Sequence, residues 1–397
     1  MTMDKASFID RYYTDRKGTN SLKWDLVDQR FSGENLLPLW VADMDFKVAE
    51  AITQAFQERV DHAVYGYSII PESYFTAYQA WMSERFNFKI EKDWIRFSPG
   101  IVQALYYFMH IYTQADDSVA ILTPVYYPFH NAVRDTGRQL VTIDLINDRN
   151  QFSIDFDKFE AEIIANKVKL FIHCSPHNPA GRVWTEEEQT RLFEICEAHD
   201  VLIISDEIHQ DFTYGDVQHI PAATVAGGKF SDRIITANSA SKSFNLAALG
   251  HSNLLISNPD LRTKYDQFAA TMIQTEANLF GVMATEAAYR SGADWLAGIK
   301  NVIFDNYQKA SARLQAELPA VTISPLQGTY LMFIDLNPIL KGHDIVDFMQ
   351  NSCGVAIDYG EWFGTGYEGY IRLNLATKYD LVEQAIEAII REAKKLN

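Results

Sequence analysis

A recurring unit of a short β-branched run, a polar or Gly/Pro turn and a longer helical stretch constrains the fold of this chain most strongly. The apolar runs are continuous instead of alternating, which is typical of parallel strands buried on both faces by helices. One helix, predicted over 186–199, should begin at a Thr185 cap with Glu188 three residues on. The predicted strands are 118–123, 139–145, 168–174, 201–205, 233–237 and 252–257.

The two ends of the chain differ from this repeating centre. After about residue 285 come long helices, strand-containing pieces at 321–336 and 355–374, and an amphipathic helix at 381–395. The first 45 or so residues lack the β/α rhythm and should pack against this C-terminal unit or a neighbouring subunit. We therefore expect a large α/β domain over 46–285 and a smaller α+β domain formed by 1–45 together with 286–397.

The acidic composition limits the classes of partner. The 35 Lys and Arg residues against 52 Asp and Glu give a formal net charge of −17, which opposes binding to nucleic acid. No stretch has the apolar length of a bilayer span, and the N-terminus lacks the pattern of a secretory signal. Three cysteines without a C-x-x-C spacing fit a reducing compartment. We expect a cytoplasmic protein with neither nucleic-acid nor membrane partners.

Four of the predicted strands are followed by side chains of different chemistry. Tyr126 comes after the first strand, Asn178 after the third, Asp206 after the fourth and Lys242 after the fifth. Ligands of open α/β sheets bind outside the carboxyl ends of the strands. An aromatic ring, an amide, a carboxylate and an amine should therefore meet at one edge of the sheet.

A phosphate-binding cradle is predicted beside these groups. The stretch 94–112 reads as a strand, a turn ending at Gly100 and a buried helix, whose first N–H groups suit a phosphate. The hydroxyls of Ser239 and Ser241, just before Lys242, add hydrogen-bonding groups. An amine, a carboxylate, an aromatic plate and a phosphate cradle are together what pyridoxal phosphate requires.

Eight motifs occur in order from near the start to near the end of the chain. They are PLWVADMDF (38–46), YGY (65–67), SPGIVQAL (98–105), PHNPAGRVW (176–184), SDEIHQDF (205–212), SASKSFNLAALG (239–250), GTYLMFIDL (328–336) and GYIRLNLA (369–376). With them the chain resembles a fold-type I pyridoxal-phosphate enzyme of the class I/II aminotransferase superfamily, and within it the MalY/PatB group of cystathionine β-lyases. The resemblance implies a mostly parallel seven-stranded sheet, a smaller α+β domain, and a homodimer with active sites at the subunit interface.

The resemblance also implies roles for individual residues. Lys242 should form the Schiff base with the cofactor, Asp206 should pair with its pyridine nitrogen, and Asn178 should hydrogen-bond its ring hydroxyl oxygen. Arg372 lies in an apolar run, where an unpaired guanidinium is costly to bury, and should bind the substrate α-carboxylate. The remaining implied contacts are ring stacking by Tyr126, phosphate binding by Gly100, Ile101, Ser239, Ser241 and Tyr67 of the neighbouring subunit, and a substrate pocket lined by Trp40, Val41 and Ala42.

One position departs from the wider superfamily. Many aminotransferases carry a phosphate-binding arginine eight residues after the Schiff-base lysine, and here that position is Gly250, followed by His251. The departure fits the lyase group better than a transaminase. His209 is either a cofactor-binding residue of the pocket or a histidine at a helix start, and both interpretations stay open.

Two other groups of residues invite a functional interpretation that we do not adopt. His173, Cys174 and His177 resemble metal ligands, but the first two alternate along a strand and should point to opposite faces, so we expect no metal site. Asp43 and Asp45 resemble a carboxylate pair, but caps or salt bridges explain such pairs more often, and both stay outside the predicted catalytic set.

The resemblance implies β-elimination from a sulfur-containing L-amino acid such as cystathionine or a cysteine S-conjugate, which yields a thiol, pyruvate and ammonia. In this reaction Lys242, with its pKa lowered by its surroundings, removes the Cα proton. Transamination is an alternative that uses the same residues. A regulatory or interaction protein on the same fold is a second alternative, although the intact Lys242, Asp206 and Arg372 count against an inactive enzyme.

Overall fold

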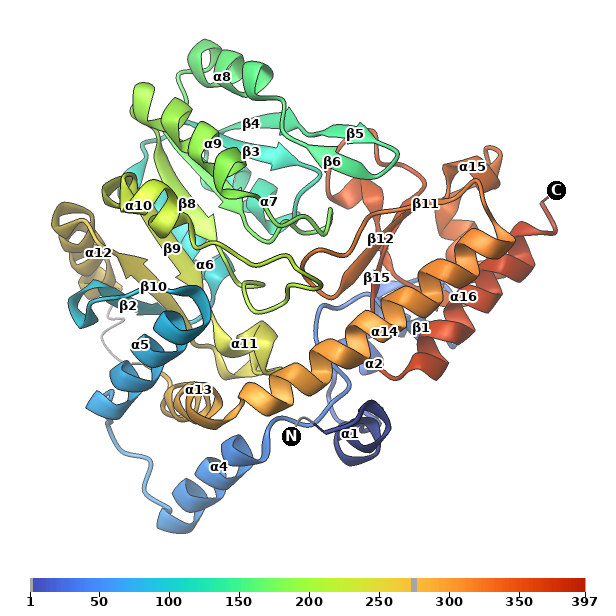
Figure 1. Ribbon diagram of the computed structural model, residues 1–397, viewed down its shortest axis with the longest axis horizontal. Coiled ribbons are helices and arrows are strands. Elements are labelled where there is room, and N and C mark those ends of the chain that lie inside the picture. Colours follow the sequence, from blue (N-terminus) through green and yellow to red (C-terminus); the bar gives the residue numbers. More distant parts are fainter. Residues whose placement is uncertain (1–2, 273–276, 397) are drawn as a thin grey trace.

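A seven-stranded sheet forms the centre of the chain in the computed structural model, which describes residues 3–272 and 277–396 (Figure 1). Only β10 runs opposite to the other six strands, which confirms the predicted α/β class with a mostly parallel sheet. All six predicted strands are present, and the seventh is the strand expected just before the turn at Gly100. In spatial order the strands are β2 (Ile95–Ser98), β10 (Ser252–Ile256), β9 (Ile234–Asn238), β8 (Leu202–Asp206), β7 (Leu170–Cys174), β3 (Ser118–Thr123) and β4 (Gln139–Asp144).

Helices cover both faces of this sheet, which explains why its strands are continuously apolar. Successive strand residues point to opposite faces, so Phe171 packs in one hydrophobic cluster and Ile172 in another. The predicted capping box is confirmed, because Thr185 and Glu188 bond reciprocally at the start of α9. Helices α8 (Phe156–Ala165) and α9 (Glu186–Ala198) contribute to the first cluster, and α6 (Ile101–Tyr112), α7 (Pro128–Asp135) and α12 (Pro259–Thr271) to the second.

A smaller antiparallel sheet is formed by the last third of the chain beside the long helices α14 (Ala293–Glu317) and α16 (Tyr379–Ala393) (Figure 1). The N-terminal segment joins this unit, because β1 (Leu37–Pro38) pairs in parallel with β13 (Val355–Ala356). The division into two domains stays a prediction. In spatial order the smaller sheet contains β11 (Thr322–Ile323), β12 (Leu331–Asp335), β15 (Tyr370–Asn374) and β14 (Asp358–Tyr359).

The first helix, α1 (Lys5–Tyr12), packs closely on α14. A Cβ on Gly298 of α14 would come within 2.4 Å of the Phe8 ring, so this contact depends on a glycine.

Within 3–272 and 277–396, no helix combines the length and apolar character needed to cross a bilayer. The remaining helices and strands are α2 (Leu22–Asp25), α3 (Val27–Arg30), α4 (Glu50–His62), α5 (Glu72–Phe86), α10 (Val225–Gly228), α11 (Ala240–Ser243), α13 (Leu279–Ser291), α15 (Asn337–Leu340), β5 (Ile146–Asp148) and β6 (Gln151–Ser153).

A buried ion pair fixes the N-terminal segment. The Lys23 ammonium lies 2.7 Å from Asp45 Oδ2, and both side chains are almost fully buried. We expect Lys23→Met to lower the free energy of unfolding by up to about 3–5 kcal/mol, because it removes the nearest cation from a buried carboxylate and leaves only Arg16, 3.4 Å from Asp45 Oδ1. Urea unfolding of the variant measures this loss. The double variant Lys23→Met/Asp45→Asn should recover part of it, and a single variant as stable as the wild type would contradict the prediction.

Candidate active site

A cavity of about 190 Å³ lies at the carboxyl ends of the central strands, and we call it the inner cavity. The parallel strands β7 and β8 end here, and the N-termini of α6 and α11 face the same space. The topology therefore brings together groups that are far apart in the sequence. Nine of the predicted site residues line the cavity, namely Ala42, Gly100, Ile101, Tyr126, Asn178, Asp206, His209, Ser241 and Lys242.

Lys242 lies on α11, the short helix that follows β9. Its Nζ donates a hydrogen bond to the Ala42 carbonyl oxygen at 2.7 Å, and the Tyr330 hydroxyl donates to the same oxygen at 2.8 Å. Burial lowers the pKa of Lys242 to about 8, although the nearby Asp43 carboxylate opposes the shift. A substantial fraction of the amine is therefore neutral near pH 8, which is the state that a base or nucleophile requires.

Asp206 is the last residue of β8 and is buried. Its Oδ1 accepts a hydrogen bond from the Ile208 backbone N–H at 3.0 Å. Burial raises the pKa of this carboxyl to about 7, while Lys242 acts in the opposite direction. A buried carboxylate in such surroundings favours a ligand that brings a positive charge.

The N-terminus of α6 and the start of α11 form the polar end of the inner cavity. Gly100 caps α6, and no atom lies within 4 Å of the place that a Cβ on it would occupy. Ser241 lines the cavity, but Ser239 does not. The Ser239 hydroxyl instead donates to the His251 carbonyl oxygen at 2.8 Å and accepts from the Ser241 backbone N–H at 3.1 Å. These two bonds of Ser239 stabilise the conformation of the turn that leads into α11.

His251 lines the inner cavity and directly follows Gly250 in the chain. Its Nε2 lies 2.7 Å from the Tyr74 hydroxyl, and burial lowers its pKa to about 4. Gly250 has a φ of +55° and carries no side chain. Neither residue supplies a positive charge near neutral pH, so the binding groups at this end of the cavity are N–H groups and hydroxyls.

Arg372, on β15, is 2% exposed and holds several acceptors together. Its guanidinium donates to Asn178 Oδ1 at 3.0 Å and to the Trp40 carbonyl oxygen at 3.3 Å. It also pairs with Asp358 on the adjacent strand β14, directly opposite in the register. Burial raises the pKa of Asp358, and the Arg372 charge opposes this shift. The Arg372 Nε has no hydrogen-bond partner among the described residues.

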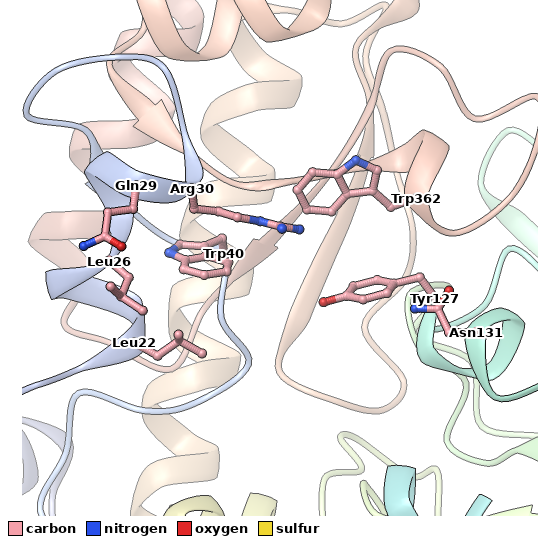
Figure 2. Close-up of a pocket in the computed structure, with 8 residues that line it drawn as sticks. All are labelled: Leu22, Leu26, Gln29, Arg30, Trp40, Tyr127, Asn131 and Trp362. Atoms are coloured by element: carbon pink, nitrogen blue, oxygen red, sulfur yellow. The ribbon is translucent and has the colours of Figure 1, made fainter. Parts of the chain in front are cut away.

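The other predicted residues lie outside the inner cavity. Tyr67 is 96% exposed in the single chain. Trp40 instead lines a neighbouring pocket of about 700 Å³, shown in Figure 2. Val41 is not among the lining residues of either space, and its carbonyl oxygen accepts a hydrogen bond from Asn374 Nδ2 at 2.6 Å. His209, by contrast, is one of the nine residues that line the inner cavity, and its Nδ1 has no hydrogen-bond partner among the described residues.

The residues that we kept outside the catalytic set have structural partners. Asp43 pairs with Arg16 at 2.8 Å, and Asp45 pairs with Lys23. His173 Nε2 faces Gln189 Oε1 at 3.3 Å, whereas Cys174 lines the inner cavity. Across the described parts of the chain, no three His, Cys, Asp or Glu side chains are grouped so as to hold a metal ion.

Sequence reasoning missed two polar residues of the site. Tyr330 lies inside the motif GTYLMFIDL, so the sequence could have pointed to it as a site residue. The motif does not, however, indicate its hydrogen bond to the Ala42 carbonyl oxygen. Asp358 carries no motif at all. Its contact with Arg372 follows from the pairing register of β14 and β15, which a single sequence does not reveal.

Comparisons with known proteins agree with this fold. The family model for aminotransferase class I and II matches residues 34–389. Cystathionine beta-lyase PatB of Bacillus subtilis is 36% identical over 94% of this chain and 97% of its own length. Protein MalY of Escherichia coli is 31% identical over 95% of this chain and 96% of its own length.

A solved structure of a related protein has the same fold. The PLP-bound C-S lyase from Staphylococcus hominis superposes with a TM-score of 0.90 at 33% identity, covering 96% of each chain. The chain belongs to the class I and II aminotransferase family. Within that family its relatives include proteins named for carbon–sulfur bond cleavage.

Proposed function

We propose that this protein is a pyridoxal-phosphate-dependent carbon–sulfur lyase that acts on sulfur-containing L-amino acids. The observation that carries the proposal is the convergence of Lys242, Asp206 and Asn178 on one small cavity. The 36% identity to a protein named cystathionine beta-lyase favours a lyase over other members of the family. The products would be a thiol, pyruvate and ammonia.

The inner cavity has the chemistry that pyridoxal phosphate requires. Asp206 is a buried carboxylate suited to a protonated ring nitrogen, and Lys242 offers an amine with a lowered pKa. The open space at Gly100 beside the first N–H groups of α6 suits a phosphate group. The Tyr126 ring forms a flat wall between these ends. We therefore infer that these residues hold the cofactor.

Pyridoxal phosphate, when bound, supplies an electron-withdrawing ring that accepts the electron pair left at Cα when a proton is removed. The chain's own part begins with Arg372, which orients the substrate α-carboxylate with Asn178 at its side. Neutral Lys242 Nζ takes the Cα proton. The Cβ–S bond then breaks, its electron pair departs with the sulfur as a thiolate, and water converts the three-carbon fragment to pyruvate and ammonia.

Arg372 is already engaged before any substrate arrives. Its contacts with Asn178, Asp358 and Trp40 hold the guanidinium in place. Because this arrangement is fixed beforehand, little side-chain entropy is lost when a carboxylate binds. The same arrangement serves transamination equally well, so it does not distinguish the two reactions.

A product assay distinguishes the lyase from a transaminase. We expect the purified holoenzyme to release thiol and pyruvate from cystathionine in equal amounts. A parallel reaction contains an amino donor with 2-oxoglutarate. Glutamate formation without release of thiol or pyruvate would overturn the proposal in favour of transamination. A protein that binds the cofactor but forms no product from either mixture would favour the regulatory alternative.

We also propose that the active unit is a cytoplasmic homodimer. Tyr67 and Ile69 are 96% and 88% exposed, which is unusual for large apolar side chains so close together. A second subunit would cover them and bring Tyr67 to the phosphate of its neighbour. The three cysteines are free and buried, which fits a reducing compartment. Sedimentation of the wild type and of Tyr67→Ala tests the dimer.

The buried Asp206 should make the cofactor-free protein pH-sensitive. Burial raises its folded-state pKa to about 7 from the ordinary value of 3.8, so between these two pH values the folded state binds more protons than the unfolded state. Its contribution to stability is therefore present below pH 4 and is lost as the pH rises through 7. Each unit of the pKa difference corresponds to about 1.4 kcal/mol.

Urea unfolding of cofactor-free wild type and Asp206→Asn at pH 5 and pH 7.5 measures this effect. The variant lacks the carboxyl group, so we expect it to be the more stable of the two at pH 7.5, with a smaller difference at pH 5. Added pyridoxal phosphate should stabilise the wild type more than the variant. A difference between the proteins that does not change with pH would contradict the prediction.

A further inference from the structure

The pocket in Figure 2, which we call the outer pocket, is not explained by cofactor binding. Its volume is about 700 Å³, far more than the 190 Å³ of the inner cavity. Three aromatic rings and two leucines give it a mostly apolar wall, to which three polar side chains are added. The lining residues are Leu22, Leu26, Gln29, Arg30, Trp40, Tyr127, Asn131 and Trp362.

The two spaces share no lining residue, but neighbouring residues of the chain line both of them. Tyr126 lines the inner cavity and Tyr127 the outer pocket. Ala42 lines the inner cavity and Trp40 the outer pocket, and the Trp40 carbonyl oxygen accepts a hydrogen bond from Arg372. One wall of the outer pocket therefore contacts Arg372, which would hold the amino-acid end of a substrate.

Arg30 is the one cation among the residues that line the outer pocket. Its guanidinium carbon lies 5.1 Å from the centre of the Trp362 ring. Figure 2 shows this side chain extending from α3 toward Trp362, with the Tyr127 hydroxyl pointing into the space between the walls. No hydrogen bond or ion pair joins the Arg30 guanidinium to any residue within 3–272 or 277–396.

A guanidinium held against an aromatic ring and free of protein acceptors is suited to a planar anion. Its N–H groups match the two oxygens of a carboxylate, which a lysine in this place would not do as well. The apolar rings nearby suit the methylene and sulfur atoms that would precede such a group. Burial raises the pKa of Asp358, and the positive charges of Arg30 and Arg372 both oppose this shift. Both cations therefore lie near the Asp358 carboxylate.

We propose that the outer pocket binds the sulfur-bearing half of the substrate and that Arg30 selects thioethers with a carboxylate at the far end of that half. This inference rests on the proposed lyase function. The amino-acid half lies at Arg372, and the half that departs as a thiolate lies along Trp40, Tyr127 and Trp362. Arg30 is then a specificity-determining residue and takes no part in proton transfer.

A matched pair of substrates tests the role of Arg30. S-(2-carboxyethyl)-L-cysteine ends in a carboxylate, and S-(2-carbamoylethyl)-L-cysteine has the same shape but ends in a neutral amide. We expect the wild-type holoenzyme to cleave the carboxylate compound with a kcat/KM about tenfold higher, as for a partly exposed charged hydrogen bond. Arg30→Gln should abolish this preference, mainly by raising KM for the carboxylate compound.

Further variants separate recognition from a general effect on the fold. Arg30→Lys should restore part of the preference, because it keeps the charge without the planar fork. Arg191→Ala removes an exposed arginine on α9 and should leave the preference intact. Added salt should reduce the wild-type preference, since Arg30 is exposed.

The outcomes distinguish this inference from the proposed function. If the wild type cleaves both compounds equally, or if Arg30→Gln keeps the preference, the inference is wrong while the lyase function stands. If the wild type releases thiol from neither compound nor from cystathionine, the proposed function itself fails. A wild type that prefers the amide would show that the outer pocket selects neutral groups, which also overturns the inference.

Discussion

Lys242→Ala should abolish both thiol release and the visible absorbance of the bound cofactor. The variant removes the amine that would bind the cofactor covalently and would act as the base at Cα. Proton transfer by a positioned base contributes about 10²–10⁴-fold to a rate, so we expect at least this loss. Pyruvate release from cystathionine and the absorbance spectrum of the purified protein measure the two effects.

A second lysine provides a matched control. Burial lowers the pKa of Lys300 to about 8, as for Lys242, but Lys300 lies near Asp211 and Arg85 outside the inner cavity. We expect Lys300→Met to keep the absorbance and the activity. Retention of both by Lys242→Ala, or their loss in Lys300→Met, would contradict the assignment. The comparison excludes the explanation that any buried lysine of lowered pKa is essential to the fold.

Arg372→Ala should have the second largest effect, and it should act on both binding and stability. Loss of one partner of a buried, hydrogen-bonded charge pair costs about 2–5 kcal/mol. Since 1.4 kcal/mol is a factor of ten, we expect kcat/KM for cystathionine to fall about a hundredfold or more. Steady-state kinetics well below the unfolding temperature measure this fall.

The same substitution leaves Asp358 buried without its cation. Removal of one partner from a buried pair typically destabilises a protein by about 3–5 kcal/mol. The double variant Arg372→Ala/Asp358→Asn removes the isolated charge, so we expect it to regain stability but not activity. If activity returned together with stability, Arg372 would be a structural residue and the proposed carboxylate site would be wrong.

The central sheet and most of the inner cavity could be predicted from the sequence because both depend on local patterns. Continuous apolar runs identify strands, and the residues that follow parallel strands meet at one edge of the sheet. Asn178, Asp206 and Lys242 occupy such positions, and all three line the cavity. For these residues, chain order and strand direction were sufficient.

The rest of the site depends on information that a single sequence does not contain. The contact between Asp358 and Arg372 requires the register of an antiparallel pair. The bond from the Ser239 hydroxyl to the His251 carbonyl oxygen depends on the conformation of two loops, and phosphate binding by Ser239 stays a prediction. Trp40 lies next to Val41 in the sequence, yet it is Trp40 that lines a pocket. The role proposed for Tyr67 requires a second subunit.

The pairing of β1 with β13 links the order of protein synthesis to the completion of the active site. Residues 37–38 leave the ribosome early, but their partners at 355–356 follow only near the end of translation. The Ala42 carbonyl oxygen, which accepts the Lys242 hydrogen bond, lies in the segment that this pairing anchors. A nascent chain therefore contains Lys242 long before β1 can pair with β13, so this pairing is among the last contacts to form around the site.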